Sequence, residues 1–175
     1  DDFVEPCQDD GLCKELVGAI FGCHVAFHRL RIEANQRKIN EPSSTEVDLM
    51  ERKHQTQVAV IGSSDPLDAQ TALLATEAGR LIAAKGAVLI CGGLGGIMEA
   101  AARGAKDAGG LTVGILPDYR KESANPFIDV ALPSGIGHAR NVIVAASGDV
   151  VVAFPGSHGT RSEISIALKL GRPVI

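Results

Sequence analysis

The feature that most constrains the fold is a regular alternation, from Gln57 onward, of short apolar runs with longer amphipathic segments. Runs that are apolar throughout are typical of strands in a parallel sheet that helices cover on both faces, because such strands bury every side chain. The alternation therefore predicts an α/β fold, a doubly wound parallel sheet of the Rossmann type. The predicted strands cover residues 58–61, 87–91, 111–116, 127–132 and 150–154, and a sixth begins at residues 173–175.

Helices are predicted between these strands, over residues 66–85, after Gly96 as far as Ala108, over residues 138–146, and after Thr160. Asp65 precedes Pro66, a pattern that predicts an N-cap followed by proline at the first helical position. Gly86 is predicted to end the first of these helices.

Residues 1–50 differ from the rest and are predicted to form an N-terminal helical extension with a linker. Apolar residues recur at spacings of three and four over residues 12–40, which places them on one stripe of a helix. Residues 41–45 then interrupt the pattern. The stripe could pack against the second region, residues 57–175, or against another copy of the chain. Because residue 175 falls within a predicted strand, we expect a truncated C-terminus.

Composition and charge disfavour several classes of partner. The net charge of -4, the 3% of aromatic residues and the absence of Trp argue against a nucleic-acid-binding protein. No apolar stretch is long enough to span a bilayer, and the acidic start does not resemble a signal peptide. Cys7, Cys13, Cys23 and Cys91 match no metal or disulfide spacing, so we expect a reduced, cytoplasmic protein. His24 and His28 are one helical turn apart, but we expect no metal site.

Three loops rich in glycine and small residues follow predicted strands. Their cores are Gly62-Ser63-Ser64, residues 92–96 and residues 156–160. In a parallel sheet such loops meet at the carboxyl edge, where backbone N–H groups and helix N-termini attract anions. The loops therefore predict a site for a small molecule that carries phosphate. Their spacing fits neither a dinucleotide fingerprint nor a P-loop, and no nucleophile elbow is present.

Charged residues next to these loops also indicate a site for an anion. Arg140 and Arg161 are predicted at helix starts, where a cation opposes the helix dipole unless an anion is bound nearby. For Arg161, a solvated surface position explains the sequence equally well. Thr160 and Glu163 fit a capping box, so Glu163 has either a structural or a catalytic role. His138 and His158 lie in the same loops and could contact phosphate.

Four motifs in order carry a family likeness. They are Gly92-Gly93-x-Gly-Gly-Ile-Met-Glu-Ala, Gly109-Gly110-x-x-x-Gly-Ile-Leu-Pro, His138-Ala-Arg-Asn and Pro155-Gly-x-x-Gly-Thr-x-x-Glu163. Together they resemble the Lonely Guy (LOG)-like Rossmann superfamily over residues 57–175, and most closely its molybdenum cofactor carrier-like branch. That resemblance implies binding of a pterin cofactor that carries phosphate, without turnover, and a homodimer or larger homo-oligomer. The superfamily's plant-hormone branch instead hydrolyses cytokinin nucleoside 5′-monophosphates to base and ribose 5-phosphate.

The resemblance also assigns residues. Arg140 matches the family arginine and Glu163 the last glutamate of the loop motif, and both would be catalytic in an enzyme. Asn141 replaces a lysine of the hormone branch, Ser157 a glycine and Ser162 a glutamate. The lost glutamate argues against hydrolysis, because a glycosidic bond needs a carboxylate to activate water or stabilise a cation. Pyridoxal-dependent lysine decarboxylation, a label of some relatives, is disfavoured because the glycine loops contain no lysine.

We therefore expect a carrier for molybdenum cofactor or a mononucleotide that requires no resident cofactor, with a nucleoside 5′-monophosphate phosphoribohydrolase as the alternative. The residues expected to bind the ligand are Gly62, Ser63, Ser64, Gly93, Gly95, Gly96, Arg140, Asn141, Gly156, Ser157, His158, Gly159 and Thr160.

Overall fold

The computed structural model describes Gly18, residues 54–65 and residues 68–175. Backbone contacts divide the chain into residues 1–54 and 55–175, and the second unit contains the sheet. The helix predicted over residues 12–40 lies, apart from Gly18, outside the described residues, as do the linker, His24, His28 and the first three cysteines.

Five parallel strands form one sheet in the order β4-β3-β2-β1-β5. The strands are β1 (Gln57–Ile61), β2 (Val88–Cys91), β3 (Thr112–Leu116), β4 (Val130–Pro133) and β5 (Val150–Ala153). The helices are α4 (Ala69–Ala84), α5 (Ile97–Asp107), α6 (Asn141–Ser147) and α7 (His158–Lys169), with short 3-10 helices η3 (Lys121–Ser123) and η4 (Gly137–Arg140). The predicted sixth strand is present as a single parallel bridge between Val151 and Val174.

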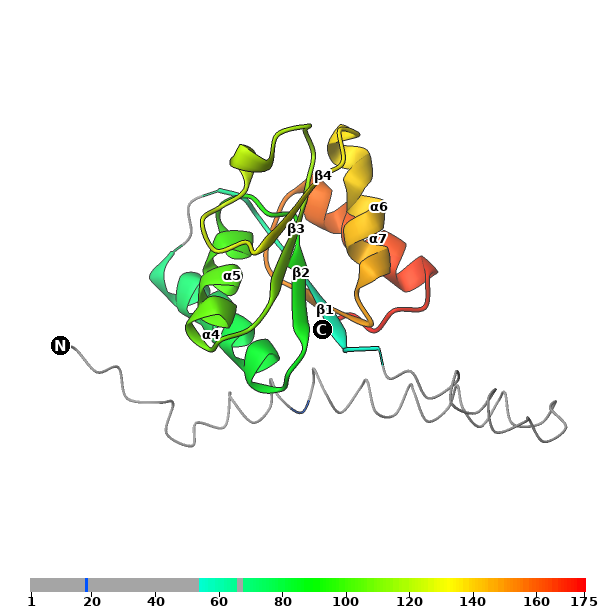
Figure 1. Cartoon of the computed structure of the whole chain (residues 1–175). Coiled ribbons are helices and arrows are strands. Elements are labelled where there is room, and N and C mark those ends of the chain that lie inside the picture. Colours follow the sequence, from blue (N-terminus) through cyan, green and yellow to red (C-terminus); the bar gives the residue numbers. More distant parts are fainter. Residues whose placement is uncertain (1–17, 19–53, 66–67) are drawn as a thin grey trace, which may run out of the picture. The chain divides into compact units, whose positions relative to one another are not determined.

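Helices cover both faces of the sheet, which confirms the predicted doubly wound fold. Figure 1 shows α4 and α5 on one face and α6 and α7 on the other. The face below α6 and α7 buries Ala59, Ile61, Ile90 and Val151 in one apolar cluster. Adjacent residues of a strand point to opposite faces, so Val58 and Val60, also fully buried, pack toward α4 and α5.

The strand order creates a crevice between β1 and β5. From β1 the chain builds outward through β2, β3 and β4, and then returns to the other side of β1 as β5. The loop after β1 leads to α4 on one face, whereas the loop after β5 leads to α7 on the opposite face. Such a topological switch point leaves an opening outside the carboxyl ends of the strands, where ligands bind in open α/β sheets.

Two helix starts differ from the predictions. The N-cap of α4 is Asp68, whose carboxylate accepts the backbone N–H of Thr71 at 2.9 Å, so the assignment of Asp65 as N-cap was wrong. The carboxylate of Asp65 instead accepts a hydrogen bond from the hydroxyl of Ser63 at 2.8 Å. Ser63 is bound on both sides, since its N–H donates to the carbonyl of Pro155 and its carbonyl accepts from Ile97. These bonds hold Ser63 in a loop beyond the end of β1, and α4 begins only at Ala69.

The capping box predicted at Thr160 and Glu163 was also wrong. Helix α7 begins at His158 with Ser157 as its N-cap, so Thr160 and Glu163 lie inside the helix, and both are buried. The spacing of three residues that suggested a cap instead places both side chains on the buried side of α7. The 3-10 helix η4 precedes α6, so Arg140 ends a tight turn rather than lying in the first turn of one long helix.

Candidate functional site

A cavity of about 130 Å³ lies at the carboxyl ends of β1, β2 and β5, where the switch point predicts one. The loop after β4 closes it from a fourth side through η4 and the start of α6. Its lining residues are Val60, Ile61, Gly62, Ser63, Ser64, Gly92, Leu94, Met98, His138, Arg140, Asn141, Ser157, Gly159, Thr160 and Glu163.

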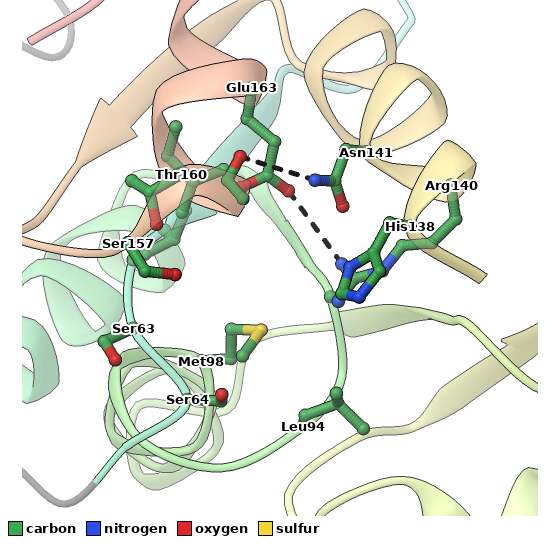
Figure 2. A pocket seen from close by; sticks show the side chains of 15 residues that line it. Ser63, Ser64, Leu94, Met98, His138, Arg140, Asn141, Ser157, Thr160 and Glu163 are labelled. Carbon is green, nitrogen blue, oxygen red and sulfur yellow. Dashed lines mark hydrogen bonds and ion pairs between the residues drawn. The ribbon is translucent and has the colours of Figure 1, made fainter.

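A buried ion pair spans the cavity between η4 and α7. Nη1 of Arg140 lies 3.9 Å from Oε1 of Glu163, and the two residues are 8% and 6% exposed. The guanidinium lies against the backbone of Gly92, where a Cβ atom would overlap Nη1. Figure 2 shows the arginine reaching across the cavity toward the glutamate. The pair is therefore held by packing on one side and faces open space on the other.

The hydrogen-bonding capacity of Arg140 is incompletely used. Its Nε is buried and has no hydrogen-bond partner among the described residues. An unfilled buried donor costs free energy, about 1–3 kcal/mol for a neutral group and more for a charged one. A bound anion would supply the missing acceptors, and guanidinium groups match phosphate and carboxylate oxygens in geometry.

Burial shifts the ionisation of the groups around this pair. It raises the pKa of Glu163 to about 7, although the neighbouring Arg140 opposes the shift. Burial also lowers the pKa of Arg140, while Glu163 opposes that change. Cys91, at the end of β2, is fully buried, which raises its thiol pKa to about 11. Cys91 is therefore a neutral thiol, and Glu163 is a carboxyl that can exchange a proton near neutral pH.

The N-terminus of α7 opens into the cavity without a side-chain cap. Ser157 is the N-cap, but its hydroxyl makes no capping hydrogen bond, and the first turn of α7 contains no acidic residue. By contrast, Asp68 caps α4, and the Ile97 N–H at the start of α5 donates to the carbonyl of Ser63 at 2.9 Å. Free N–H groups at a helix start attract anions, so α7 rather than α5 presents the stronger anion site.

Asn141 and Ser162, two positions at which this chain differs from the hormone branch, contact each other. The Asn141 amide donates to the Ser162 hydroxyl at 3.1 Å and to the carbonyl of Gly159 at 3.3 Å, which ties α6 to α7. Ser162 does not line the cavity. Its hydroxyl donates to the carbonyl of Gly159 at 2.7 Å and accepts from the Asn141 amide, so Ser162 helps to join the first turn of α7 to α6.

The structure brings together eight of the thirteen residues expected to bind a ligand. Those that line the cavity are Gly62, Ser63, Ser64, Arg140, Asn141, Ser157, Gly159 and Thr160, and Glu163 lies among them. The remaining five, Gly93, Gly95, Gly96, Gly156 and His158, do not line it.

These five residues lie behind the cavity wall or outside it. The Gly93 N–H donates to Sγ of Cys91 at 3.3 Å, and Gly96 packs against the backbone of Ser63. Gly156 packs against Thr160, and His158 is exposed. Gly96 and Gly156 therefore let the loops approach one another closely.

Sequence reasoning missed the apolar side of the cavity. Leu94 and Met98, from the loop after β2 and the first turn of α5, form part of its wall (Figure 2). Neither residue type signals a ligand, and only the position of α5 brings them there. Gly92 lay in a recognised motif, but its contact with Arg140 could not be read from spacing. Arg161 is exposed and does not line the cavity, in agreement with its interpretation as a surface arginine.

Two searches of the described residues gave negative results. No group of three or more His, Cys, Asp or Glu side chains in the described residues could hold a metal ion. Over the same residues, no helix combines the length and apolar character needed to cross a membrane.

Comparisons with known proteins agree with the fold and with the resemblance drawn from the motifs. An uncharacterized protein of Archaeoglobus fulgidus is 51% identical over 118 residues, 67% of this chain and 77% of its own. The molybdenum cofactor binding protein of Rippkaea orientalis superposes with a TM-score of 0.68 at 40% identity, covering 70% of this chain and 76% of its own. The molybdenum cofactor carrier protein of Chlamydomonas reinhardtii superposes with a TM-score of 0.65 at 35% identity, covering 69% and 75%.

A relative with enzymatic activity is more distant. The cytokinin riboside 5′-monophosphate phosphoribohydrolase of Mycobacterium tuberculosis is 35% identical over 112 residues, which cover 61% of this chain and 59% of the enzyme. The LOG-like resemblance is thus confirmed, with structural neighbours in the molybdenum cofactor carrier branch. Residues 55–175, which build the sheet and the whole cavity, match a single family model, and the chain belongs to the SLOG cluster4 family.

Proposed function

We propose that this protein binds a small molecule through its phosphate group and carries it without turnover, and that the cargo is molybdenum cofactor or a mononucleotide of similar size. The observation that carries the proposal is the buried Arg140, with an unpartnered Nε, facing the uncapped start of α7 across one cavity. The two features are independent of each other, and both are satisfied by the same anion.

Three hydroxyl side chains line the cavity from different elements. Ser63 lies in the loop after β1, Ser157 is the N-cap of α7 and Thr160 lies in the first turn of α7 (Figure 2). Leu94 and Met98 line the cavity toward α5. A phosphate bound to Arg140 and α7 would therefore leave the organic part of the ligand beside an apolar wall, as in most small-molecule sites.

The size of the cavity indicates how much of a ligand it encloses. A water-sized probe occupies roughly 10–15 Å³, so the cavity of about 130 Å³ has room for a phosphate and about one ring. A pterin cofactor or a complete mononucleotide would extend past Leu94 and His138, and His138 is exposed. The molybdenum cofactor binding relatives, at 35% to 40% identity, favour the pterin cargo.

The test is a thermal-shift titration of the full chain with molybdopterin, AMP and inorganic phosphate. We expect each to raise the melting temperature of the wild type, and Arg140→Gln to abolish the effect. Arg161→Gln is the matched control, because Arg161 lies in α7 but outside the cavity. If Arg140→Gln responds to these ligands as the wild type does, the phosphate does not bind at this site and the proposal is wrong.

A second candidate function is hydrolysis of nucleoside 5′-monophosphates, favoured by one observation. Glu163 is a cavity carboxyl whose pKa is raised to about 7, a value suited to proton transfer near neutral pH. The relative from Mycobacterium tuberculosis, a cytokinin riboside 5′-monophosphate phosphoribohydrolase at 35% identity, indicates which substrates to test. Incubation with AMP and with a cytokinin riboside monophosphate, followed by chromatography for released base, separates the two functions. Base released by the wild type and not by Glu163→Gln would establish the hydrolase.

A further inference from the structure

We infer that anion binding in the cavity is coupled to the uptake of one proton by Glu163, so that this carboxyl regulates the affinity of the site. The inference rests on the proposed function, since it requires that the anion binds at Arg140. Beyond that function, we infer that the charged form of Glu163 competes with the ligand for Arg140, whereas the neutral form does not.

The geometry makes this competition unavoidable. Among the described residues, the only ion pair of Arg140 is the one with Glu163, at 3.9 Å, which is longer than the 2.7–2.9 Å of a charge-assisted hydrogen bond. The guanidinium lies against the backbone of Gly92, which blocks its movement in that direction. A phosphate that reaches Arg140 must therefore share the same cation with the carboxylate.

Arg140 is the only lysine or arginine among the described residues that line the cavity with Glu163. Arg140 faces it from η4, the neutral thiol of Cys91 from the end of β2, and His138 lines the same cavity nearer its mouth. The loop after β1 contributes only uncharged residues to this cavity. Helix α5 contributes Met98, which is also uncharged. When the ligand engages Arg140, a charged Glu163 is left buried beside a second anion.

Protonation relieves that conflict at small cost. Glu163 is 6% exposed, so little water is available to disperse a negative charge. Burial already raises the pKa of Glu163 to about 7, and an added anion raises it further because it disfavours the charged form. Where Glu163 is charged before binding, at pH values above about 7, the proton is taken from solvent as the ligand enters and returns to solvent as the ligand leaves.

The sign of the pH dependence follows from linkage. The ligand prefers the protonated site, so affinity is greatest below the pKa of the free carboxyl and falls as pH rises through it. With that pKa at about 7, we expect the dissociation constant to increase about tenfold between about pH 6 and pH 8.

Sulfate is the suitable probe, because its charge does not change near neutral pH, whereas that of a phosphate monoester does. Sulfate would be titrated into the full chain at about pH 6, 7 and 8 and constant ionic strength, with binding followed by backbone NMR shifts of the α7 start. Glu163→Gln should bind equally at all three values, and at the highest pH it should bind about tenfold more tightly than the wild type. Glu99→Gln, a carboxyl of α5 that does not line the cavity, is the matched control and should keep the wild-type dependence.

A second readout does not depend on any variant. The side-chain carboxyl carbon of Glu163 reports its titration directly by NMR, and saturating sulfate should move the midpoint to higher pH. An unchanged midpoint, or an affinity for sulfate that is the same at all pH values, would overturn the inference while leaving the binding site intact. Loss of the pH dependence in His138→Gln would also overturn it, because His138 would then be the proton acceptor. Failure of sulfate to bind at any pH would instead count against the proposed function.

Discussion

At the scale of single residues, Arg140 is the position where stability and function conflict. A buried guanidinium with an unfilled donor is unfavourable in an empty protein, and one carboxylate at 3.9 Å compensates it only in part. Gly92 is required beside Arg140, since only a residue without a side chain leaves room for the guanidinium there. The arrangement is easier to explain by a bound anion than by the needs of folding.

The contact with Gly92 leads to the first prediction. In Gly92→Ala, the new methyl group would overlap the guanidinium and displace it from the cavity. We expect the affinity for sulfate to fall about tenfold to hundredfold, the equivalent of losing a charged hydrogen bond of about 1.5–3 kcal/mol. NMR titration at about pH 6 would measure it.

Gly95→Ala is the control for this substitution. It lies in the same loop, and its added Cβ would be 3.4 Å from the nearest atom, the carbonyl oxygen of Ser64, so the loop can accept it with a small adjustment. An equal loss of affinity in both variants would mean that the loop backbone contacts the ligand, as the sequence predicted for Gly95, and that Arg140 is not displaced.

At the scale of elements, three helices follow the three glycine-rich loops, but their N-termini differ. Within the described residues, α4 is capped by Asp68, and α5 is closed by the carbonyl of Ser63. Helix α7 keeps its first turn open toward the cavity. An uncapped helix start forgoes about 0.5–2 kcal/mol of stabilisation, which an anion at the same place restores.

The second prediction tests this division of roles. Ser157→Asp should raise the free energy of unfolding by about 0.5–1 kcal/mol, since a carboxylate at the N-cap accepts the free N–H groups and favours the helix dipole. The same carboxylate should occupy the anion site and lower the affinity for sulfate at least about tenfold. Urea denaturation and NMR titration would measure the two effects.

Ser165→Asp is the matched control, because it adds the same charge to an exposed position of the same helix, away from the first turn. It should leave sulfate affinity nearly unchanged. If Ser157→Asp stabilises the protein but still binds sulfate as the wild type does, the start of α7 is not the anion site.

At the scale of the whole molecule, the ionisation of Glu163 affects folding as well as binding, and this is the third prediction. The folded protein holds the proton of this carboxyl up to about pH 7, whereas the unfolded chain releases it near its ordinary value of 4.5. Stability therefore falls as pH rises through that window. At 1.36 kcal/mol per pKa unit, the shift from 4.5 to about 7 corresponds to a loss of roughly 3 kcal/mol.

Comparison of the wild type with Glu163→Gln isolates this contribution from other titrating groups. In urea denaturation, the variant should gain stability relative to the wild type between about pH 5 and pH 8. A difference between the two proteins that is the same at both pH values would show that burial of Glu163 carries no such cost.

The fourth prediction concerns assembly. We propose a homo-oligomer, as the family resemblance implies, that buries the outer face of α6, where Val142 and Ile143 are exposed by 50% and 41%. Light scattering on Val142→Glu/Ile143→Glu should then report a monomer. Leu73→Glu, at a position of α4 exposed by 71%, should leave the assembly unchanged. An assembly that survives both changes would place the contact elsewhere.

The pattern of residues was enough to predict a parallel sheet, the succession of strands and helices along the chain, and the sheet edge at which the cavity lies. Fully apolar runs such as 58–61 and 150–154 can be buried only in a sheet covered on both faces, and glycine-rich loops after parallel strands must meet at one edge. Arg140 and Glu163 were found as well, one because it opposed a helix dipole and both because they matched family motifs.

Which of these residues line the cavity together depended on the packing of the helices. A capping box and a helix that turns its side chains toward the sheet have the same spacing, so Thr160 and Glu163 could not be placed from sequence. Gly92 and Gly96 also look alike in a motif, yet one supports Arg140 and the other supports Ser63. Local spacing fixes how a segment folds, whereas contacts between separate elements, such as that of Arg140 with Glu163, depend on how α5, η4 and α7 pack around the end of the sheet.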